Sequence, residues 1–266
     1  MEQLAGAARR HTRVVRPSLS VGVADSPEVI RAAQELRYRV FADEMGANLS
    51  TAIPGLDHDP FDAHCHHLVV RDETNGEVVG TYRILTPESA SRIGYYSETE
   101  FDLARLDHLR SQLVEIGRSC VHPGHRSGAT ITLLWAGLGQ FMKEHGYKYL
   151  IGCASVSMAD GGHLAASLYS SLSSGAHSRM APEQYHVFPR CPLPLAALRR
   201  DLPVEAPPLI KGYLRAGAWV CGEPAWDPDF NTADLPLLLP MARLSDRYAR
   251  HFLGEQGGGG TSVMNG

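Results

Sequence analysis

The feature that most limits how this chain can fold is a pair of apolar, β-branched segments separated by Asn75-Gly76. The two segments are residues 67–70 (HLVV) and 78–85 (VVGTYRIL). Asn-Gly favours the positive φ angles of a type I′ turn, whose twist matches that of two antiparallel strands. The sequence therefore predicts a β-hairpin here, and a sheet around it against which the rest of the chain must pack.

Helical and extended patterns alternate irregularly around this hairpin. Ser26-Pro27-Glu28 offers an N-cap, a proline and an acid for a first turn, so a helix is predicted from there to about Met45, before Gly46. Periodicity predicts further helices at 129–145, 163–173, 208–216 and 245–252, and strands at 112–121, 147–156, 218–223 and 235–241. This order indicates an α/β fold with a mixed central sheet and helices on both faces.

The chain of 266 residues fits one domain. We expect that domain to span residues 21–253, with a proline-rich excursion at about 181–208. Residues 1–20 and 254–266 are polar, basic or glycine-rich, so both are predicted to be flexible segments.

Charge and cysteine content exclude several classes of protein. A formal net charge of −4 gives no electrostatic reason to expect nucleic-acid binding. No apolar run approaches the roughly 18–20 residues needed to span a bilayer, and the N-terminus lacks the apolar core of a secretory signal. The 5 cysteines are scattered and odd in number, unlike a disulfide framework. We expect a cytoplasmic protein; a peripheral contact with the inner face of the cytoplasmic membrane stays open.

Charged residues gather near the ends of the predicted elements. Asp57, Asp59 and Asp62 share one loop, and Arg83 lies on the second hairpin strand. Arg37 falls on the apolar face of the first helix, together with Ile30, Ala33, Val40 and Phe41. Carboxylates can hold an ammonium group and a guanidinium can hold a carboxylate, so the set points to recognition of an amino acid. We expect the acidic loop, Arg83 and Glu115 of the following strand to converge on a single cavity. Each residue taken alone is more typical of a surface charge or a structural ion pair than of a binding site.

Glu115 is an acid inside the otherwise apolar strand LVEIG, where an unpaired carboxylate is costly. An ion pair with Arg118 is the simplest explanation, but residues three apart on a regular strand lie on opposite faces. Gly117 favours a β-bulge, which would turn Glu115 and Arg118 into one cleft and free a backbone N–H. The residues alone leave a structural and a catalytic role open.

Several short blocks, taken in order, resemble a known family. Residues 37–41 (RYRVF), 44–46 (EMG), 57–62 (DHDPFD), 80–83 (GTYR), 101–103 (FDL) and 115–121 (EIGRSCV) are similar to the acyl-carrier-protein-dependent branch of the GNAT acetyltransferase superfamily. That branch contains acyl-homoserine-lactone synthases and ornithine lipid N-acyltransferases. Residues 152–155 (GCAS), 208–215 (PLIKGYLR) and 229–234 (DFNTAD) resemble the second group, and the similarity covers about residues 28–252.

The resemblance implies a GNAT-like fold and transfer of a 3-hydroxyacyl chain from acyl carrier protein to the α-amine of L-ornithine, forming lyso-ornithine lipid. It implies no tightly bound cofactor and no metal, because the donor is the acyl-phosphopantetheine of the carrier protein. Glu115 falls at the position of the general base, with Arg118 beside it as a second catalytic residue. The implied substrate-binding residues are Arg37, Phe41, Asp59, Asp62 and Arg83.

The segment 121–130 (VHPGHRSGAT) departs from the pyrophosphate loop of coenzyme A enzymes, since it has one residue fewer between Arg126 and Gly128. It keeps backbone amides and a basic side chain at a predicted helix start. Arg126, Gly128 and Ala129 are therefore expected to bind the phosphopantetheine phosphate, with coenzyme A less favoured as donor. An ordinary glycine-rich turn between a strand and a helix is the alternative.

Other patterns favour other functions less well. Cys120-x-His122 suggests a nucleophile and base, but neighbouring positions rarely give that geometry. Histidines at 58–67 lack the paired spacing of zinc sites. Residues on the helix 129–145 can form either core or an acyl tunnel; they are Leu134, Trp135, Leu138 and Phe141. An acyl-homoserine-lactone synthase or another N-acyl-amino-acid synthase remains the enzymatic alternative, and a non-catalytic module that binds acyl carrier protein or lipid remains the other.

Overall fold

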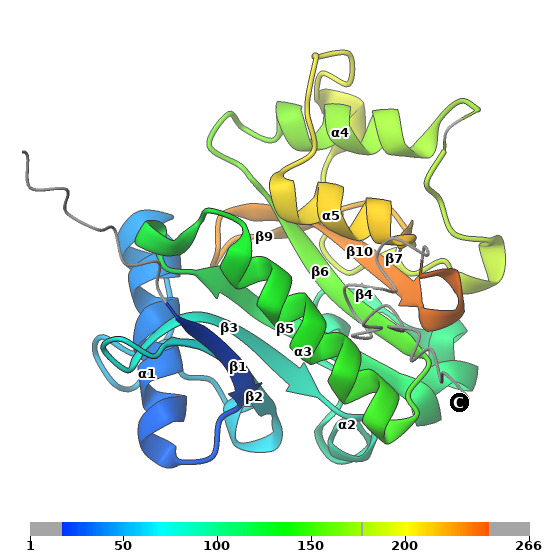
Figure 1. Ribbon diagram of the computed structural model, residues 1–266. Helices are drawn as coiled ribbons and strands as arrows, with labels where there is room; N and C mark the ends of the chain where they lie inside the picture. Colours follow the sequence, from blue (N-terminus) through cyan, green and yellow to red (C-terminus); the bar gives the residue numbers. More distant parts are fainter. Residues whose placement is uncertain (1–17, 177, 245–266) are drawn as a thin grey trace, which may run out of the picture.

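The structure, a computed structural model, describes residues 18–176 and 178–244. Within them the strands form one mixed sheet in the order β1-β2-β3-β5-β6-β10-β8, with β9 also pairing with β10 (Figure 1). The strands are β1 (Leu19–Val23), β2 (His66–Asp72), β3 (Glu77–Leu85), β5 (Leu113–Val121), β6 (Tyr149–Ser157), β8 (Trp219–Val220), β9 (Ala225–Asp227) and β10 (Thr232–Pro240). A small second sheet pairs β4 (Phe101–Asp102) with β7 (Phe188–Pro189).

Helices cover both faces of the main sheet, as predicted. They are α1 (Pro27–Tyr38), α2 (Pro87–Ile93), α3 (Ala129–His145), α4 (His163–Ser173) and α5 (Pro208–Ala216). Figure 1 shows α3 in front of the strands and α1 behind them. None of the helices in the described ranges is long and apolar enough to cross a membrane.

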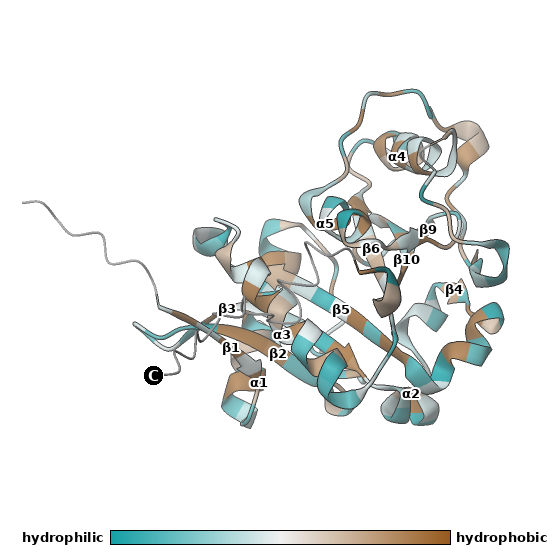
Figure 2. Cartoon of the chain, turned by 45° about the vertical axis from the view of Figure 1, so that its right-hand side comes forward, coloured by the Kyte–Doolittle hydropathy of each residue, from teal (hydrophilic) through white to brown (hydrophobic). Residues whose placement is uncertain are grey.

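The alternating direction of side chains along the strands explains why helices pack on both faces of the sheet. Leu68 and Val70 belong to the apolar cluster that contains Leu134 and Leu138 of α3. Val69, the residue between them, belongs instead to the cluster around α1. Successive side chains of a strand point to opposite faces, so each face of the hairpin has its own helix to pack against. Figure 2 shows that the apolar colouring of β5 is interrupted by hydrophilic residues.

Most predicted elements are confirmed. The hairpin forms around Gly76, which has a φ angle of 76°, and α3 has the predicted bounds. The first helix continues beyond α1 as a π-helical turn at Arg39–Glu44 and ends before Gly46. The last predicted strand is the longer β10, whereas the predicted strand at 218–223 is reduced to β8, Trp219–Val220.

Two regions differ from the sequence-based expectations. Leu19 and Ser20, assigned above to a flexible segment, belong to β1 and pair with β2, so the domain begins before residue 21. The segment 86–111, for which no element was predicted, folds into α2, β4 and two 3₁₀-helices, Tyr96–Thr99 and Ala104–Gln112. The second of these includes Gln112, which was predicted to begin the strand 112–121. The rest of the predicted flexible ends and the predicted helix at 245–252 fall outside the described residues.

The main sheet divides in its middle. β5 and β6 are parallel neighbours, but their pairing covers only Leu113–Glu115 against Tyr149–Ile151. Both strands continue further, β5 paired with β3 and β6 paired with β10. The sheet therefore opens into a fork that begins at Glu115.

Gly152 allows the two strands to approach closely at the start of the fork. A Cβ atom on Gly152 would lie 2.6 Å from the carbonyl oxygen of Ile116, which is backbone and cannot rotate away. We expect Gly152→Ala to lower the free energy of unfolding by about 1–3 kcal/mol through overpacking. Urea denaturation followed by circular dichroism measures this change.

The matched control is Gly22→Ala in β1, where a Cβ atom would meet nothing within 4 Å. This control should be neutral or stabilise by up to about 1 kcal/mol, because alanine restricts the unfolded chain. Equal stabilities for the two variants would contradict the proposed tight approach of β5 and β6.

Candidate active site

A cavity of about 1240 Å³ fills the fork of the sheet. Residues of both diverging strands line it, Glu115–Val121 from β5 and Leu150–Ser155 from β6. Helix α5 and the 3₁₀-helix Tyr96–Thr99 contribute further walls. Of the residues predicted to form the site, the cavity is lined by Phe41, Arg83, Glu115, Arg118, Arg126 and Gly128. Ala129, the first residue of α3, is not among the lining residues.

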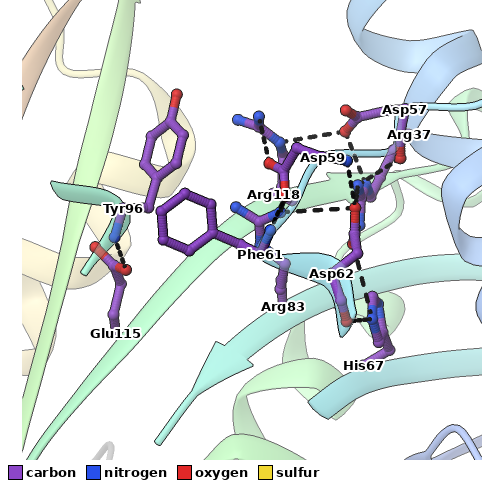
Figure 3. Close-up of polar contacts among 10 residues, drawn as sticks. All are labelled: Arg37, Asp57, Asp59, Phe61, Asp62, His67, Arg83, Tyr96, Glu115 and Arg118. Carbon is purple, nitrogen blue, oxygen red and sulfur yellow. Dashed lines mark hydrogen bonds and ion pairs between the residues drawn. The ribbon is translucent and has the colours of Figure 1, made fainter. Parts of the chain in front are cut away.

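Arg37 forms the buried centre of a polar network beside this cavity (Figure 3). Its guanidinium donates from Nε to Asp57 at 2.8 Å, and from Nη1 and Nη2 to the two oxygens of Asp62 at 2.6 and 3.0 Å. Nη2 also donates to the backbone carbonyl of Asp57 at 2.5 Å. Four bonds in fixed directions attach the loop 57–62 to helix α1.

Asp59 connects this network to the cavity. One of its oxygens accepts from Arg83 at 2.6 Å and the other from Arg118 at 3.1 Å. Arg118 Nε also lies 3.2 Å from Asp57. The predicted convergence of the acidic loop and the hairpin arginine is therefore observed. Because three arginines face three aspartates, the loop carboxylates are already neutralised without a substrate ammonium.

The electrostatics of the network follow from this pairing. Burial by itself raises the pKa of Asp62, but Arg37 and Arg83 outweigh it and bring that pKa down to about 2. Burial likewise opposes ionisation of Asp59, yet Arg83 and Arg118 hold its pKa below the usual value. Burial also lowers the pKa of Arg37, and its bonds to Asp62 and Asp57 reverse that effect. All these groups are charged at neutral pH.

Glu115 is buried and accepts hydrogen bonds from a segment for which the sequence predicted no element. Its Oε2 accepts from the backbone N–H of Tyr96 at 2.6 Å, and its Oε1 accepts from Ser97 N at 2.6 Å and Ser97 Oγ at 2.5 Å. It therefore caps the 3₁₀-helix Tyr96–Thr99 and forms no ion pair with Arg118. Burial raises the pKa of Glu115 above its usual value, although the bonds from Ser97 and Tyr96 oppose that effect.

The predicted β-bulge is present. Thr81 pairs with Cys120 and Arg83 with Gly117, so β5 carries one more residue than β3 between these pairs. Arg118 has a φ angle of 50°, which a non-glycine residue seldom adopts outside such features. The bulge allows Glu115 and Arg118 to line the same cavity.

Aromatic rings complete the polar side of the cavity. The guanidinium carbon of Arg118 lies 4.5 Å from the ring centre of Phe230 and 5.0 Å from that of Tyr96. Arg83 lies 5.6 Å from the ring centre of Phe61 and 5.7 Å from that of Tyr96. No periodic pattern in the sequence marks these rings, because they come from irregular segments. They restrict the directions in which the two arginines can point.

Part of the cavity lining is apolar. It includes Trp135, whose neighbours Leu134 and Leu138 are buried core residues. Trp135 stacks on Tyr213 with ring centres 5.7 Å apart, and its Nε1 donates to the hydroxyl of Tyr82 at 3.2 Å. Of the two roles considered for this helix, Trp135 thus lines the cavity while Leu134, Leu138 and Phe141 belong to the core. Other apolar lining residues are Ile131, Leu150, Leu209, Leu237 and Leu239.

Arg126 lies at the rim of the cavity, next to the start of α3. It is exposed and forms a bidentate ion pair with Glu44. Its Nη1 and Nη2 donate to the two carboxylate oxygens at 2.6 and 2.7 Å. Gly128 precedes α3 with a φ angle of 97°. Backbone N–H groups at such a helix start carry partial positive charge, so the segment has the polarity expected of a phosphate site.

The two alternative site chemistries, a cysteine nucleophile and a histidine metal site, gain no support. Burial raises the pKa of the Cys120 thiol to about 12, which is unfavourable for a nucleophile. His67, from the histidine-rich segment, is buried with its Nε2 3.1 Å from the carbonyl oxygen of Asp62. Across residues 18–176 and 178–244, the histidines form no cluster of potential metal ligands.

Comparison with known proteins agrees with this geometry. Residues 36–136 match the model of the acetyltransferase (GNAT) domain. The chain is 37% identical over 258 residues to an L-ornithine N(alpha)-acyltransferase of Brucella abortus, covering 90% of each chain. It is 37% identical over 254 residues to the protein of the same name in Rhodobacter capsulatus, covering 88% of this chain and 95% of that one.

Solved structures share the fold at low sequence identity. The AHL synthase LasI superimposes with a TM-score of 0.53 at 13% identity, covering 90% of this chain and 96% of that one. FeeM, an N-acyl amino acid synthase from uncultured soil microbes, superimposes with a TM-score of 0.52 at 12% identity, covering 85% and 92%. These similarities confirm the predicted GNAT-like fold.

The paired state of Asp62 predicts a dependence of stability on pH. The pKa of this carboxyl is lower in the folded protein than its unfolded value of 3.8, so its contribution is complete above about pH 4 and is lost as the pH falls towards 2. We expect this contribution to be about 2 kcal/mol. Urea denaturation between pH 6 and pH 2.5 measures it.

Asp62→Asn should be less stable at neutral pH by about 3–5 kcal/mol, because it removes a partner of the buried Arg37. It should also lose less stability than the wild type on acidification. The exposed Asp43→Asn serves as control and should keep the wild-type dependence. An acid response of Asp62→Asn as steep as that of the wild type would contradict the assigned role of this ion pair.

Proposed function

The chain belongs to the L-ornithine N(alpha)-acyltransferase family, and on that premise we propose that it transfers a 3-hydroxyacyl chain from the phosphopantetheine of acyl carrier protein to the α-amine of L-ornithine. The product would be lyso-ornithine lipid. The observation that carries this proposal is the cavity in the fork of the sheet, whose lining combines Glu115 and arginines with a large number of apolar residues.

Glu115 is proposed as the general base. An α-amine with a pKa of about 8 is mostly protonated at neutral pH and must lose a proton to attack a thioester. Within the part of the chain that the structure describes, Oε2 of Glu115 accepts one hydrogen bond, from the Tyr96 N–H, so it can accept a further proton from the amine, directly or through water. The raised pKa of this buried carboxyl favours such a transfer.

The bulge in β5 is proposed to stabilise the tetrahedral intermediate. A bulge takes one residue out of regular strand pairing, here Arg118 or Ser119 opposite Tyr82. A backbone N–H released in this way can donate to the oxyanion that forms when nitrogen attacks the thioester carbon. Arg118, held by Asp59 and the aromatic rings, is proposed to assist as a fixed positive charge beside that oxygen.

The donor is proposed to enter the cavity from its rim. Backbone amides around Gly128 and Ala129 would bind the phosphate of phosphopantetheine, with Arg126 exchanging its contact with Glu44 for the phosphate. The acyl chain would then lie along Trp135 and the other apolar lining residues. Arg37, Phe41, Asp59, Asp62 and Arg83 are proposed to shape the acceptor side of the cavity. Peripheral contact with a membrane stays a prediction, since the helix predicted at 245–252 lies outside the described residues.

A product assay tests the proposed reaction. The purified chain is incubated with 3-hydroxyacyl carrier protein and L-ornithine, and products are read by mass spectrometry. We expect N-α-acylated ornithine, and at least about tenfold lower kcat/KM with the matching acyl-coenzyme A. Acylation of a different amine, or no acylation of ornithine, would contradict the proposed acceptor. Equal use of coenzyme A would contradict the proposed donor.

Glu115→Gln tests the base. We expect kcat to fall by about 10²- to 10⁴-fold, because the amide cannot accept the proton. The variant should also lose about 1–3 kcal/mol of stability, since its NH₂ group would face N–H donors of the 3₁₀-helix. Ser97→Ala is the matched control: it removes the hydroxyl bond to Glu115 but leaves the carboxylate. If Glu115→Gln and Ser97→Ala reduce kcat equally, Glu115 has only a structural role.

A further inference from the structure

A second group of acids lies at the cavity, apart from the arginine network. Asp227 and Asp234 line the same cavity as Glu115, as does Cys153. Glu100 stands next to them: one carboxylate oxygen of Glu100, one of Asp234 and the sulfur of Cys153 all lie within 4.8 Å of one another. None of these residues is among those predicted to form the site, although Cys153 and Asp234 lie in the blocks 152–155 and 229–234 that carry the family resemblance.

This group lacks the cations that neutralise the loop aspartates. Both carboxylate oxygens of Glu100 are buried, and among the described residues neither is paired with a backbone N–H, a hydroxyl or a cation. The side chains next to them are the carboxyl of Asp234 and the thiol of Cys153. Asp234 accepts from the hydroxyl of Thr232 at 3.1 Å. None of the ion pairs within residues 18–176 and 178–244 includes Glu100, Asp227 or Asp234. Two buried carboxyls in contact without a cation are costly in a folded protein.

This cost shifts the pKa of both carboxyls upwards. Burial raises the pKa of Glu100 well above its usual value, and the neighbouring Asp234 adds to that effect. Burial also raises the pKa of Asp234. A bound cation would take the place of the proton that the pair otherwise holds. The geometry therefore describes an acidic site whose negative charge a bound cation would neutralise.

The position of the group identifies the kind of cation. Ser97 Oγ bonds to Glu115 and lies 3.4 Å from the sulfur of Cys153, so a single side chain separates the proposed base from the acidic group. The two nitrogens of an extended ornithine are roughly 6 Å apart. One acceptor molecule can therefore present its α-amine to Glu115 and its side-chain ammonium to the acids.

A metal ion suits this set less well. Zinc and other thiophilic metals need a thiolate, and burial together with Glu100 and Asp234 raises the pKa of Cys153 well above its usual value. Magnesium and calcium bind six or more oxygens, and the cluster supplies two carboxylates and a sulfur.

We propose that Glu100 and Asp234, with Asp227 beside them, form the subsite for the side-chain ammonium of the acceptor amino acid. The inference rests on the proposed function and deepens it, because it explains how a diamino acid would be chosen over neutral amino acids. A primary ammonium donates up to three hydrogen bonds, which matches the buried oxygens of Glu100 and the carboxylate of Asp234, none of which is paired with a cation among the described residues.

The first test compares acceptors in the wild-type protein. L-Norvaline has the same three-carbon side chain as L-ornithine but no ammonium. With 3-hydroxyacyl carrier protein as donor, we expect kcat/KM to be about 10- to 100-fold lower for norvaline, mainly through KM. Equal values for the two acceptors would overturn the subsite while leaving the proposed acyl transfer intact.

The second test removes the carboxylates one at a time. Glu100→Gln and Asp234→Asn should each reduce kcat/KM for ornithine by about 10- to 100-fold and change that for norvaline by less than about threefold. Glu183→Gln, which removes an exposed carboxylate away from the cavity, is the matched control. Thermal unfolding checks that each variant is folded. An unchanged preference for ornithine in both variants would contradict the proposal.

Calorimetric binding separates this inference from the proposed reaction. Titration of L-ornithine into the protein without donor should show binding that is at least about tenfold weaker for L-norvaline and for Glu100→Gln. This result would support the subsite even if no acyl transfer to ornithine were detected. Equal binding of both amino acids would overturn it. Stoichiometric metal in the purified wild type that is lost in Asp234→Asn would also overturn it, in favour of a metal site.

Discussion

The buried contact between Arg37 and the loop 57–62 is the interaction on which the polar side of the cavity depends. Arg37 fixes Asp57 and Asp62 to helix α1, and Asp59 of the same loop then holds Arg83 and Arg118. A charge taken wholly out of water is tolerated only with such partners. The positions of Arg83 and Arg118 are thus set by one short loop, and the position of that loop is set by Arg37 of helix α1.

Local sequence signals were sufficient for much of the fold and part of the site. The hairpin around Asn75-Gly76, the bounds of α3 and the bulge near Gly117 are confirmed because each depends on residues close together in the chain. The convergence of Arg83 with the loop aspartates was also predicted. The pairing of all three aspartates with arginines was not, since it requires the distances between four separate elements.

Residues that come from irregular segments could not be predicted. Tyr96 and Ser97, which bind Glu115, lie in the segment 86–112, whose 3₁₀-helices have no apolar period to reveal them. Glu100 resembles an ordinary loop acid in the sequence. Only the folded chain shows that its carboxylate is buried against Asp234, more than a hundred positions away.

The fork of the sheet makes the molecule bipartite. Glu115 and Arg83 belong to the half that contains β3 and β5, whereas Asp227 and Asp234 belong to the half that contains β9 and β10. Along β5 and β6, three residue pairs join the halves. A ligand that contacts both groups of residues would therefore bridge the two halves of the sheet. Only a ligand whose length matches the distance between the two halves could make both contacts. Binding of such a ligand would also restrict the motion of one half relative to the other.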